Sequence, residues 1–352
     1  MTPTLSDLPD RLEGPAAWTG PDLAAAPDSW RRTLSEADVA ELVAAAESYR
    51  ETGRDIGEIS ADAFPLPTLG PRLQEMRAAL IHGVGVQLIS GLPVERLDRW
   101  TAAAIFCGIG AHLGKARSQN AEGHILGHVR DVGRDPDDPN ARIYQTAARQ
   151  TFHTDSADVV GLLCLREAKE GGDSLLVSAE AIYNRMRADH PDLLPLLFEG
   201  LATDRRGEVP EGAKPWMEIP PLNWHEGRLT VFYQRQYIDS AQRFPEAPRL
   251  TEAHVAALDA FDALADDPAL HVTMRLAPGD MQFVYNHAML HDRTGFTDWP
   301  EPDRRRHLLR LWLSMPGDRP LPDCFRQRFG SIAIGDRGGI ITSKTRLHAP
   351  LD

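Results

Sequence analysis

The sequence predicts an α+β, mainly β fold: an antiparallel barrel or jelly roll with helices packed outside it. From about residue 140 onward the chain carries short segments rich in branched and aromatic residues, as expected for strands. The helical stretches between them are irregularly spaced, which disfavours a doubly wound parallel sheet. The expected strands are "RIYQTA", "VVGLLCLRE", "GDSLLVS", "LTVFYQRQYI", "HVTMRLAPGDMQFVYNHAML" and "HLLRLWLSM".

Helices are expected before and between these strands. Ser35 is a suitable N-cap with Asp38 three residues later, and Gly53 ends the apolar stripe that follows. This pattern predicts a helix over most of 35–53. The other elements expected outside the β-rich segments are one buried strand and three helices, at 83–93, 97–114, 178–198 and 251–265.

The length of 352 residues admits one large domain or two. We expect a single compact unit in which residues 1–80 form an N-terminal extension and a helix that packs on the core. Residues 81–352 then form the main β domain with its helical insertions. The first thirty residues are rich in Pro, Gly and Ala and are expected to wrap the surface.

The composition, 42% hydrophobic and 25% charged, is that of a globular protein with a sizeable core. A net charge of −13 argues against nucleic acid or an anionic membrane as the main partner, while a local cationic pocket for a small anion is compatible with it. Three single cysteines without a C-x-x-C pair suit reduced, packed thiols. No signal-peptide pattern or apolar run of ~18 residues occurs, so a cytoplasmic location is expected. A homo-oligomer is compatible with these features.

The segment "TFHTDSADVV" raises a question, because a strand entering the core carries His153 and Asp155 at its start. Residues i and i+2 of a strand project on one face, so the imidazole and the carboxylate would point together and could hold one metal ion. Alone, the pattern is weak, and it describes a satisfied core histidine and a turn-capping aspartate more often than a metal site. Asp158 is a rival carboxylate, but its spacing places it on the opposite face.

A second polar set lies in the segment that begins at Pro278. The pattern predicts a strand over 281–291, a polar loop and a strand over 305–314, forming a long hairpin. The second strand is apolar on both faces, so buried Arg306 and Arg310 need anionic partners. For Arg306 we favour a ligand carboxylate over an internal ion pair.

Two histidines of this segment compete for a metal role. On a strand His287 and His291 would share a face, so spacing alone does not choose between them. "HAMLH" lacks the glutamate that a zincin carries beside its first histidine. Two histidines and one carboxylate from distant segments form the facial triad of non-haem Fe(II) oxygenases, whose open positions suit a keto-acid cosubstrate.

Three segments give the chain a family resemblance: "FHTD" at 152–155, "GGDS" at 171–174 and "HDRTGF…RRRHLLRLWLSMP" at 291–316. With them the chain resembles the taurine dioxygenase-like (TauD/TfdA) family of Fe(II)/2-oxoglutarate-dependent oxygenases. The resemblance covers most of 80–316, and the first seventy residues match loosely. It implies a double-stranded β-helix (jelly-roll) core, and Fe(II), 2-oxoglutarate and O2 as cofactor and cosubstrates.

Carried over by position, the resemblance implies a site. His153, Asp155 and His291 match the three iron ligands, and Arg306 matches the arginine that binds the distal carboxylate of 2-oxoglutarate. Ser174 stands where members commonly have a hydroxyl residue, usually threonine, that bonds the same carboxylate. An aspartate at 155, rather than alanine or glycine, points away from the halogenase branch.

The substrate pocket is less specified. Arg310 matches a position that can meet an anionic group of the substrate, with a structural ion pair as the even alternative. Polar residues near the motifs add further candidates, for which ordinary hydrogen bonding under a loop is the competing interpretation. They are Gln119, Asn120, His128, Tyr144, Gln145, Tyr233 and Arg235. Asn286 is a candidate for ordering the metal ligands.

The leading hypothesis is an enzyme that oxidises a C–H bond of a small, carboxylate-bearing or amino-acid-like molecule and releases succinate and CO2. The alternative is a non-catalytic jelly-roll protein that binds or senses 2-oxoglutarate or a related acid. A third hypothesis is a zinc hydrolase that uses His287 and His291. Substrate binding, succinate release and metal identity separate the three.

Overall fold

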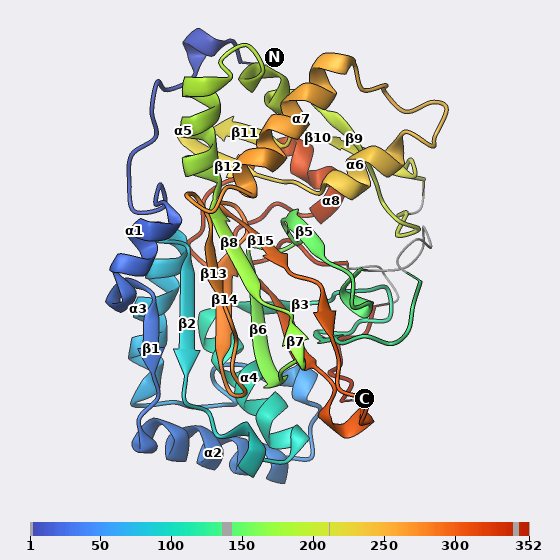
Figure 1. The fold of residues 1–352 in the computed structure, drawn as a ribbon. Helices are drawn as coiled ribbons and strands as arrows, with labels where there is room; N and C mark the ends of the chain where they lie inside the picture. Colours follow the sequence, from blue (N-terminus) through green and yellow to red (C-terminus); the bar gives the residue numbers. More distant parts are fainter. Residues whose placement is uncertain (1–2, 136–142, 211, 341–344, 352) are drawn as a thin grey trace.

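A seven-stranded sheet forms the centre of the molecule (Figure 1). The computed structural model describes residues 3–135, 143–210, 212–340 and 345–351. The sheet runs in the order β1-β2-β14-β6-β17-β3, and β4 also pairs with β17. Its pairs are antiparallel except that of β1 with β2. The strands are β1 (Arg31–Thr33), β2 (Val86–Ser90), β3 (Lys115–Arg117), β4 (Leu126–Val129), β6 (Val159–Arg166), β14 (Met281–Tyr285) and β17 (His307–Ser314).

A four-stranded antiparallel sheet packs against the first, in the order β13-β8-β15-β5. Its strands are β5 (Gln150–His153), β8 (Ser174–Ser178), β13 (Val272–Met274) and β15 (Met289–Arg293). Leu176 of β8 and Met289 of β15 belong to the same hydrophobic core as the large sheet. The two sheets therefore enclose a common interior.

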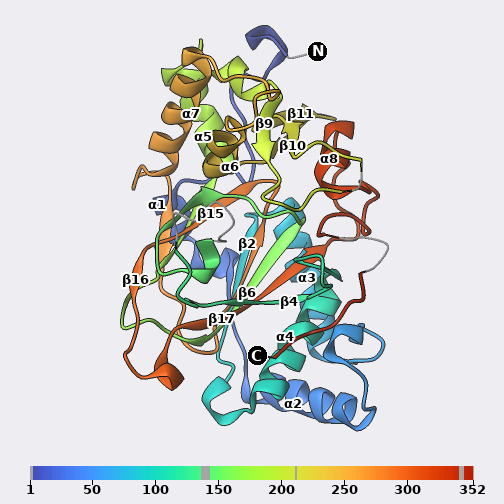
Figure 2. The ribbon, with the colours of Figure 1, turned by 90° about the vertical axis from the view of Figure 1, so that its right-hand side faces the viewer.

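Helices cover the other face of the large sheet, as Figure 2 shows for α3 and α4. The three helices there are α2 (Glu36–Glu51), α3 (Leu69–His82) and α4 (Arg99–Leu113). Helix α2 begins where the sequence predicts: the Ser35 hydroxyl accepts from the backbone N–H of Asp38, and the Asp38 carboxylate accepts from that of Ser35. Helix α4 is buried over most of its length because it packs between α2, α3 and β17.

A second cluster of helices and short hairpins lies above the sheets in Figure 1. Its core joins α5 and α7 to β8, β12 and β15. The helices of this cluster are α5 (Ala179–Asp189), α6 (Arg235–Ala241), α7 (Glu252–Ala265) and α8 (Arg326–Phe329). Helix α1 (Gly20–Ala25) lies beside β13, and its Leu23 belongs to the core of the large sheet. The remaining strands are β7 (Glu170–Gly171), β9 (Leu201–Asp204), β10 (Trp216–Ile219), β11 (Leu222–His225), β12 (Arg228–Val231) and β16 (Phe296–Thr297).

The structure confirms the helices predicted at 35–53, 97–114 and 251–265, and the predicted strand at 83–93. The helix predicted over 178–198 ends at Asp189, and a 3-10 turn follows at Leu194–Phe198. None of the helices in the described part of the chain has both the length and the apolar character needed to cross a bilayer.

The hairpin predicted for 281–314 is wrong. The chain turns at 286–288, so β14 lies in the large sheet and β15 in the four-stranded sheet. Strand β17 pairs with β6, β3 and β4 instead. The prediction failed because "YNHAM" has no Gly or Pro to mark the turn that moves the chain between sheets.

Two other strand predictions are also wrong in part. Residues Ile143–Gln145 of "RIYQTA" form a 3-10 turn, and "LTVFYQRQYI" leaves the strand after Val231 and enters α6 at Arg235. The burial expected of β17 is confirmed, since all eight of its residues are buried.

Candidate metal centre

The structure brings His153, Asp155 and His291 together at the mouth of the space between the sheets. His153 ends β5 and is paired in register with His291 of β15, and their ring centroids are 4.2 Å apart. The Nε2 atom of His291 lies 3.8 Å from Oδ2 of Asp155. One ligand atom from each residue lies within 4.8 Å of the others.

Asp155 reaches this cluster in a way that the sequence did not predict. Strand β5 ends at His153, so Asp155 belongs to the turn that follows and does not share a strand face with the histidine. The side chain of Asn286 holds this turn, because its Oδ1 accepts from the backbone N–H of Asp155 at 3.1 Å. The indole N–H of Trp312 donates to Oδ2 of Asp155 at 2.9 Å and fixes the carboxylate.

Burial sets the protonation states of the three side chains. It lowers the pKa of His291 to about 3, helped by the neighbouring His153, and it also lowers the pKa of His153. Burial alone would raise the pKa of Asp155, but the Arg310 guanidinium and the two imidazoles lower it to about 2. Two neutral imidazoles and an ionised carboxylate are the forms that bind a divalent metal at neutral pH.

The Nδ1–H of His153 donates to the backbone carbonyl of Thr151 at 2.8 Å, so its Nε2 carries the lone pair, which accepts from the side-chain amide of Gln150 at 2.8 Å. The Nδ1 atom of His291 is buried and has no hydrogen-bond partner in the described part of the chain. The donor set of two nitrogens and one carboxylate oxygen fits a ferrous ion with open positions.

A deeper pocket beside the cluster contains Arg306 and Ser174. Arg306 is buried, and its Nη1 atom has no partner among the described residues. Burial lowers the pKa of Arg306 to about 10, so the guanidinium is charged at neutral pH. A Cβ at Gly172 would lie 2.9 Å from Nε of Arg306, so glycine there leaves room for the side chain.

Arg293 brings a second guanidinium to the same pocket. Arg293 stands beside Ser174 in the register of β15 and β8 and donates to the carbonyl oxygens of Thr146 and Ala148. Burial and the nearby Arg306 lower its pKa to about 9. Two buried cations without an ion-pair partner among the described carboxylates suit an anionic ligand group, such as the distal carboxylate of 2-oxoglutarate.

Arg310 lies between the two cavities and is already well paired. Its Nε donates to Oε1 of Gln119 at 2.7 Å, and its Nη1 lies 3.5 Å from Oδ2 of Asp155. The guanidinium also stacks 4.5 Å from the ring centroid of Tyr144. Gln119 is therefore brought to the site, where it supports Arg310 instead of facing the cavity.

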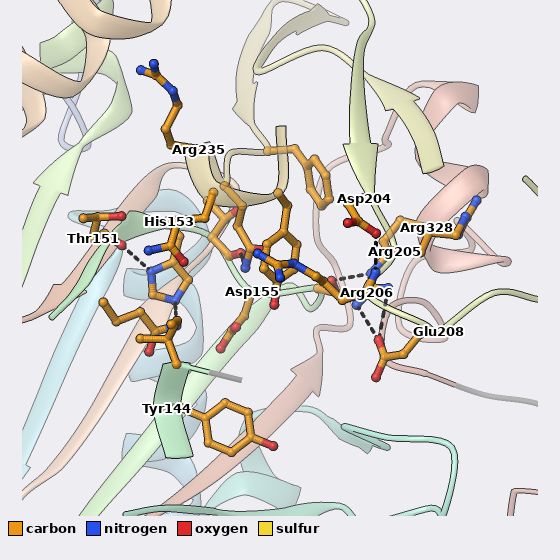
Figure 3. A pocket seen from close by; sticks show the side chains of 18 of the residues that line it. Tyr144, Thr151, His153, Asp155, Asp204, Arg205, Arg206, Glu208, Arg235 and Arg328 are labelled. Carbon is orange, nitrogen blue, oxygen red and sulfur yellow. Dashed lines mark hydrogen bonds and ion pairs between the residues drawn. The ribbon is translucent and has the colours of Figure 1, made fainter. Parts of the chain in front are cut away.

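The larger cavity opens in front of the metal cluster (Figure 3). Tyr144 and Arg310 line it, together with residues of the loop after β9 and of α6 and α8. Arg235 stands on its wall but points away from it in Figure 3. Its guanidinium is bound to three carboxylates, those of Asp239, Asp259 and Asp262.

Other predicted substrate residues lie elsewhere. Asn120 bonds His124, and His128 bonds the imidazole of His307 at 2.8 Å. Gln145 belongs to the 3-10 turn before β5. None of Asn120, His128 and Gln145 lines either cavity beside the metal cluster. Tyr233 is fully buried and donates its hydroxyl hydrogen to Asp262.

His287 belongs to a separate buried network. Its Nε2 lies 2.8 Å from Oδ1 of Asp158, the rival carboxylate, which therefore does not face the metal cluster. The Arg337 guanidinium lies 2.7 Å from the same oxygen and 2.8 Å from Oδ2 of Asp318. Since this guanidinium forms an ion pair with each of the two carboxylates, we interpret the group as structural.

Sequence reasoning missed several side chains that line the cavities. Trp312 could have been found, because alternation along the strand expected at 305–314 places it on the same face as Arg306 and Arg310. No sequence pattern predicted that three arginines line the larger cavity, since they come from a loop and a short helix far along the chain from the metal ligands. These residues are Arg205, Arg206 and Arg328.

Comparison with known proteins adds family evidence to this geometry. The family described as "Taurine catabolism dioxygenase TauD, TfdA family" matches residues 49–312. FR-33289 synthase of Streptomyces rubellomurinus is 35% identical over 299 residues, which span 83% of this chain and 87% of that protein. The taurine hydroxylase-like protein SAT17 of Stachybotrys chartarum is 31% identical over 312 residues, which span 86% of this chain and 80% of that protein.

Solved structures share the fold. An asparagine oxygenase in complex with Fe(II), 2S,3S-3-hydroxyasparagine and succinate superposes with a TM-score of 0.63 at 21% identity, covering 81% of this chain and 93% of that one. The non-heme iron oxygenase OrfP with Fe and α-ketoglutaric acid gives a TM-score of 0.58 at 16% identity, covering 80% and 93%. The chain therefore belongs to the TauD/TfdA family and is an Fe(II)/2-oxoglutarate-dependent oxygenase.

Proposed function

We propose that His153, Asp155 and His291 hold the ferrous ion, and that Arg306 and Ser174 bind the distal carboxylate of 2-oxoglutarate. The observation that carries this proposal is the meeting of the three donors beside a pocket with unpaired cationic nitrogen. We also propose that the two packed sheets form a double-stranded β-helix core, with residues 1–80 as an extension on the domain of 81–352.

The residues of the chain would act by position and electrostatics. When bound, iron and 2-oxoglutarate supply an oxidant made from O2, and succinate and CO2 are released. Asn286 and Trp312 hold Asp155 in place, and Arg306 anchors the acid in a dry pocket where a charged hydrogen bond is strong. The buried walls keep water from the reacting C–H bond.

The substrate is a small anionic molecule, carboxylate-bearing or amino-acid-like, held in the larger cavity in front of the metal cluster. The arginines that line this cavity support an anion. Related proteins are named for asparagine and for uridine-5'-phosphate, and the uridine-5'-phosphate dioxygenase of Amycolatopsis sp. is 29% identical over 202 residues, which span 53% of this chain and 68% of that protein. A cytoplasmic location and a homo-oligomer are part of the proposal.

Anaerobic addition of Fe(II) and 2-oxoglutarate tests the site. We expect a weak visible charge-transfer band that His291→Ala and His153→Ala abolish, while His287→Ala retains it if it folds. A wild-type protein without the band would overturn the proposal.

A turnover screen with candidate substrates, read by succinate release and product mass together, tests the substrate class. A sensor would bind 2-oxoglutarate under air without forming succinate with any substrate. A zinc hydrolase would regain activity with zinc instead of iron.

A further inference from the structure

We propose that one wall of the larger cavity is a subsite for a phosphoryl or phosphonyl group of the substrate, formed by Arg205, Arg206 and Arg328. Glu208 is the internal counter-ion that this group displaces. The inference rests on the proposed function, because it takes the cavity beside the metal cluster to be the substrate site.

All three arginines line the cavity. Arg205 and Arg206 follow β9, whereas Arg328 comes from α8, more than one hundred residues later. In Figure 3 they gather with Glu208 on the side of the cavity opposite His153. A molecule that reaches from the metal cluster to this wall would present its C–H bond at one end and its anionic group at the other.

Charge is unevenly distributed in this lining. Five arginines and three carboxylates line the cavity, in a chain whose net charge is −13. Two of the arginines are engaged elsewhere: Arg235 is bound to three carboxylates outside the lining, and Arg310 is paired with Asp155. Two of the carboxylates are engaged elsewhere: Asp155 belongs to the metal cluster, and Asp204 is bound by Arg243 and by the Ser240 hydroxyl. Glu208 is the lining carboxylate that remains for the arginine wall.

Arg205 is the strongest single observation. Its side chain is buried, with 6% of the residue exposed, and its Nε donates to the carbonyl oxygens of Lys214 and Trp216. No carboxylate of the described residues forms an ion pair with it. Burial, and then the neighbouring Arg328, lower the pKa of Arg205. A buried cation beside another cation is costly without an anion.

Arg328 connects this wall to the metal cluster. Its Nε donates to the hydroxyl of Ser156, the residue after Asp155, at 2.7 Å. Its two terminal nitrogens share Oε2 of Glu208 at 3.3 and 3.4 Å. These distances exceed the ~2.7–2.9 Å of a good charge-assisted bond, so Glu208 holds the guanidinium loosely.

Arg206 is set into the cavity by an unusual backbone. Its φ is 50°, in the left-handed region, where a residue other than glycine costs of order 1 kcal/mol. The Asp204 carboxylate accepts from its backbone N–H at 2.8 Å, and its guanidinium stacks 4.8 Å from the ring centroid of Tyr237. Both contacts hold the side chain on the cavity wall.

The number of guanidiniums indicates the class of anion. A single carboxylate needs one planar donor pair, which one arginine supplies. Three arginines on one cavity wall suit a doubly charged tetrahedral group with several acceptor oxygens, and arginine is the usual residue for bidentate phosphate recognition. The structure thus favours a phosphorylated or phosphonate substrate over a simple amino acid.

The test uses the full chain, loaded anaerobically with Fe(II) and 2-oxoglutarate, and methylphosphonate as the probe. Binding is followed by the broadening of the phosphorus NMR line, which a nearby paramagnetic iron causes. We expect saturable broadening that acetate at equal concentration does not reverse. Arg205→Gln and Arg328→Gln should each weaken binding about tenfold, while Arg326→Gln, an exposed arginine of the same helix, should leave it unchanged.

Glu208→Gln should have the opposite effect on methylphosphonate affinity from the two arginine substitutions. Removal of the competing carboxylate should tighten methylphosphonate binding several-fold, which loss of structure cannot do. Binding that is unchanged by the Arg205 and Arg328 substitutions, or weakened by Glu208→Gln, would overturn the subsite. The visible band separates the two proposals: its absence defeats the metal site, whereas a normal band without methylphosphonate binding defeats the subsite alone.

Discussion

His291 lies directly opposite His153 in the antiparallel pair of β15 and β5, with the ring centroids 4.2 Å apart. Cross-strand neighbours have a fixed separation, so the sheet itself sets the distance between the two imidazoles. Asp155, in contrast, sits in a turn and depends on side-chain contacts for its position. This difference predicts which substitutions near the centre affect metal binding.

Trp312→Phe should weaken Fe(II) binding by about 10- to 100-fold, because it removes the indole N–H that holds the Asp155 carboxylate. Phenylalanine keeps an apolar aromatic ring at this buried position, so the fold should persist. Titration of Fe(II) into the 2-oxoglutarate-containing protein, read by the visible band, measures the change. Trp299→Phe, remote from the centre, is the matched control, and equal affinities for the two variants would contradict the role of Trp312.

Arg306→Met should abolish 2-oxoglutarate binding and at the same time stabilise the ligand-free protein. The guanidinium is buried without an ion-pair partner among the described residues, and burial lowers its pKa to about 10. Replacing an uncompensated buried charge by an apolar side chain removes its desolvation cost.

Thermal unfolding without ligand and calorimetric titration with 2-oxoglutarate check the two halves of this prediction. The exposed neighbour Arg305, changed to Met, should alter neither quantity appreciably. A ligand-free Arg306→Met protein that unfolds at a lower temperature than the wild type would show that the guanidinium has a structural partner instead.

The sequence patterns predicted the residues of the candidate metal site more accurately than they predicted the strands and their pairing. The pairing of His153 with Asp155 could be predicted because the two residues are close together in the sequence. The turn that positions Asp155 could not be predicted. His291 and His287 could not be separated by spacing, since the sequence does not mark the turn at 286–288, which contains His287 and leaves only His291 on β15. Arg328 reaches the cavity through a contact with Ser156 across 172 positions, and no local pattern encodes such a contact.

Gln119→Leu should destabilise the protein by about 1–3 kcal/mol, since it leaves the Nε of Arg310 and two buried carbonyl oxygens without their partner. Urea unfolding measures the loss. Asn120→Leu is the comparison, because Asn120 is more exposed and its side chain bonds only His124 among the described residues. A larger cost at Asn120 than at Gln119 would contradict the assignment of Gln119 as the support of Arg310.

The metal-free protein should lose stability as the pH falls below about 6.5, and His307 should account for part of the loss. Burial, together with the adjacent His128 and nearby arginines, lowers the pKa of His307 to about 3. The ordinary pKa of about 6.5 applies in the unfolded chain, so between these two values the unfolded state binds the extra proton. The stability that neutral His307 supplies is thus complete above pH 6.5 and is lost progressively towards pH 3.

At pH 5 the linkage amounts to roughly 2 kcal/mol for one such histidine. His307→Asn should therefore show a smaller difference in the free energy of unfolding between pH 7 and pH 5 than the wild type does, by about that amount. His82→Asn, a substitution of an exposed histidine at the end of α3, should keep the wild-type difference. Urea unfolding of all three metal-free proteins at both pH values measures these differences. Equal losses of unfolding free energy for His307→Asn and the wild type would mean that His307 takes up its proton in the folded protein as readily as in the unfolded chain.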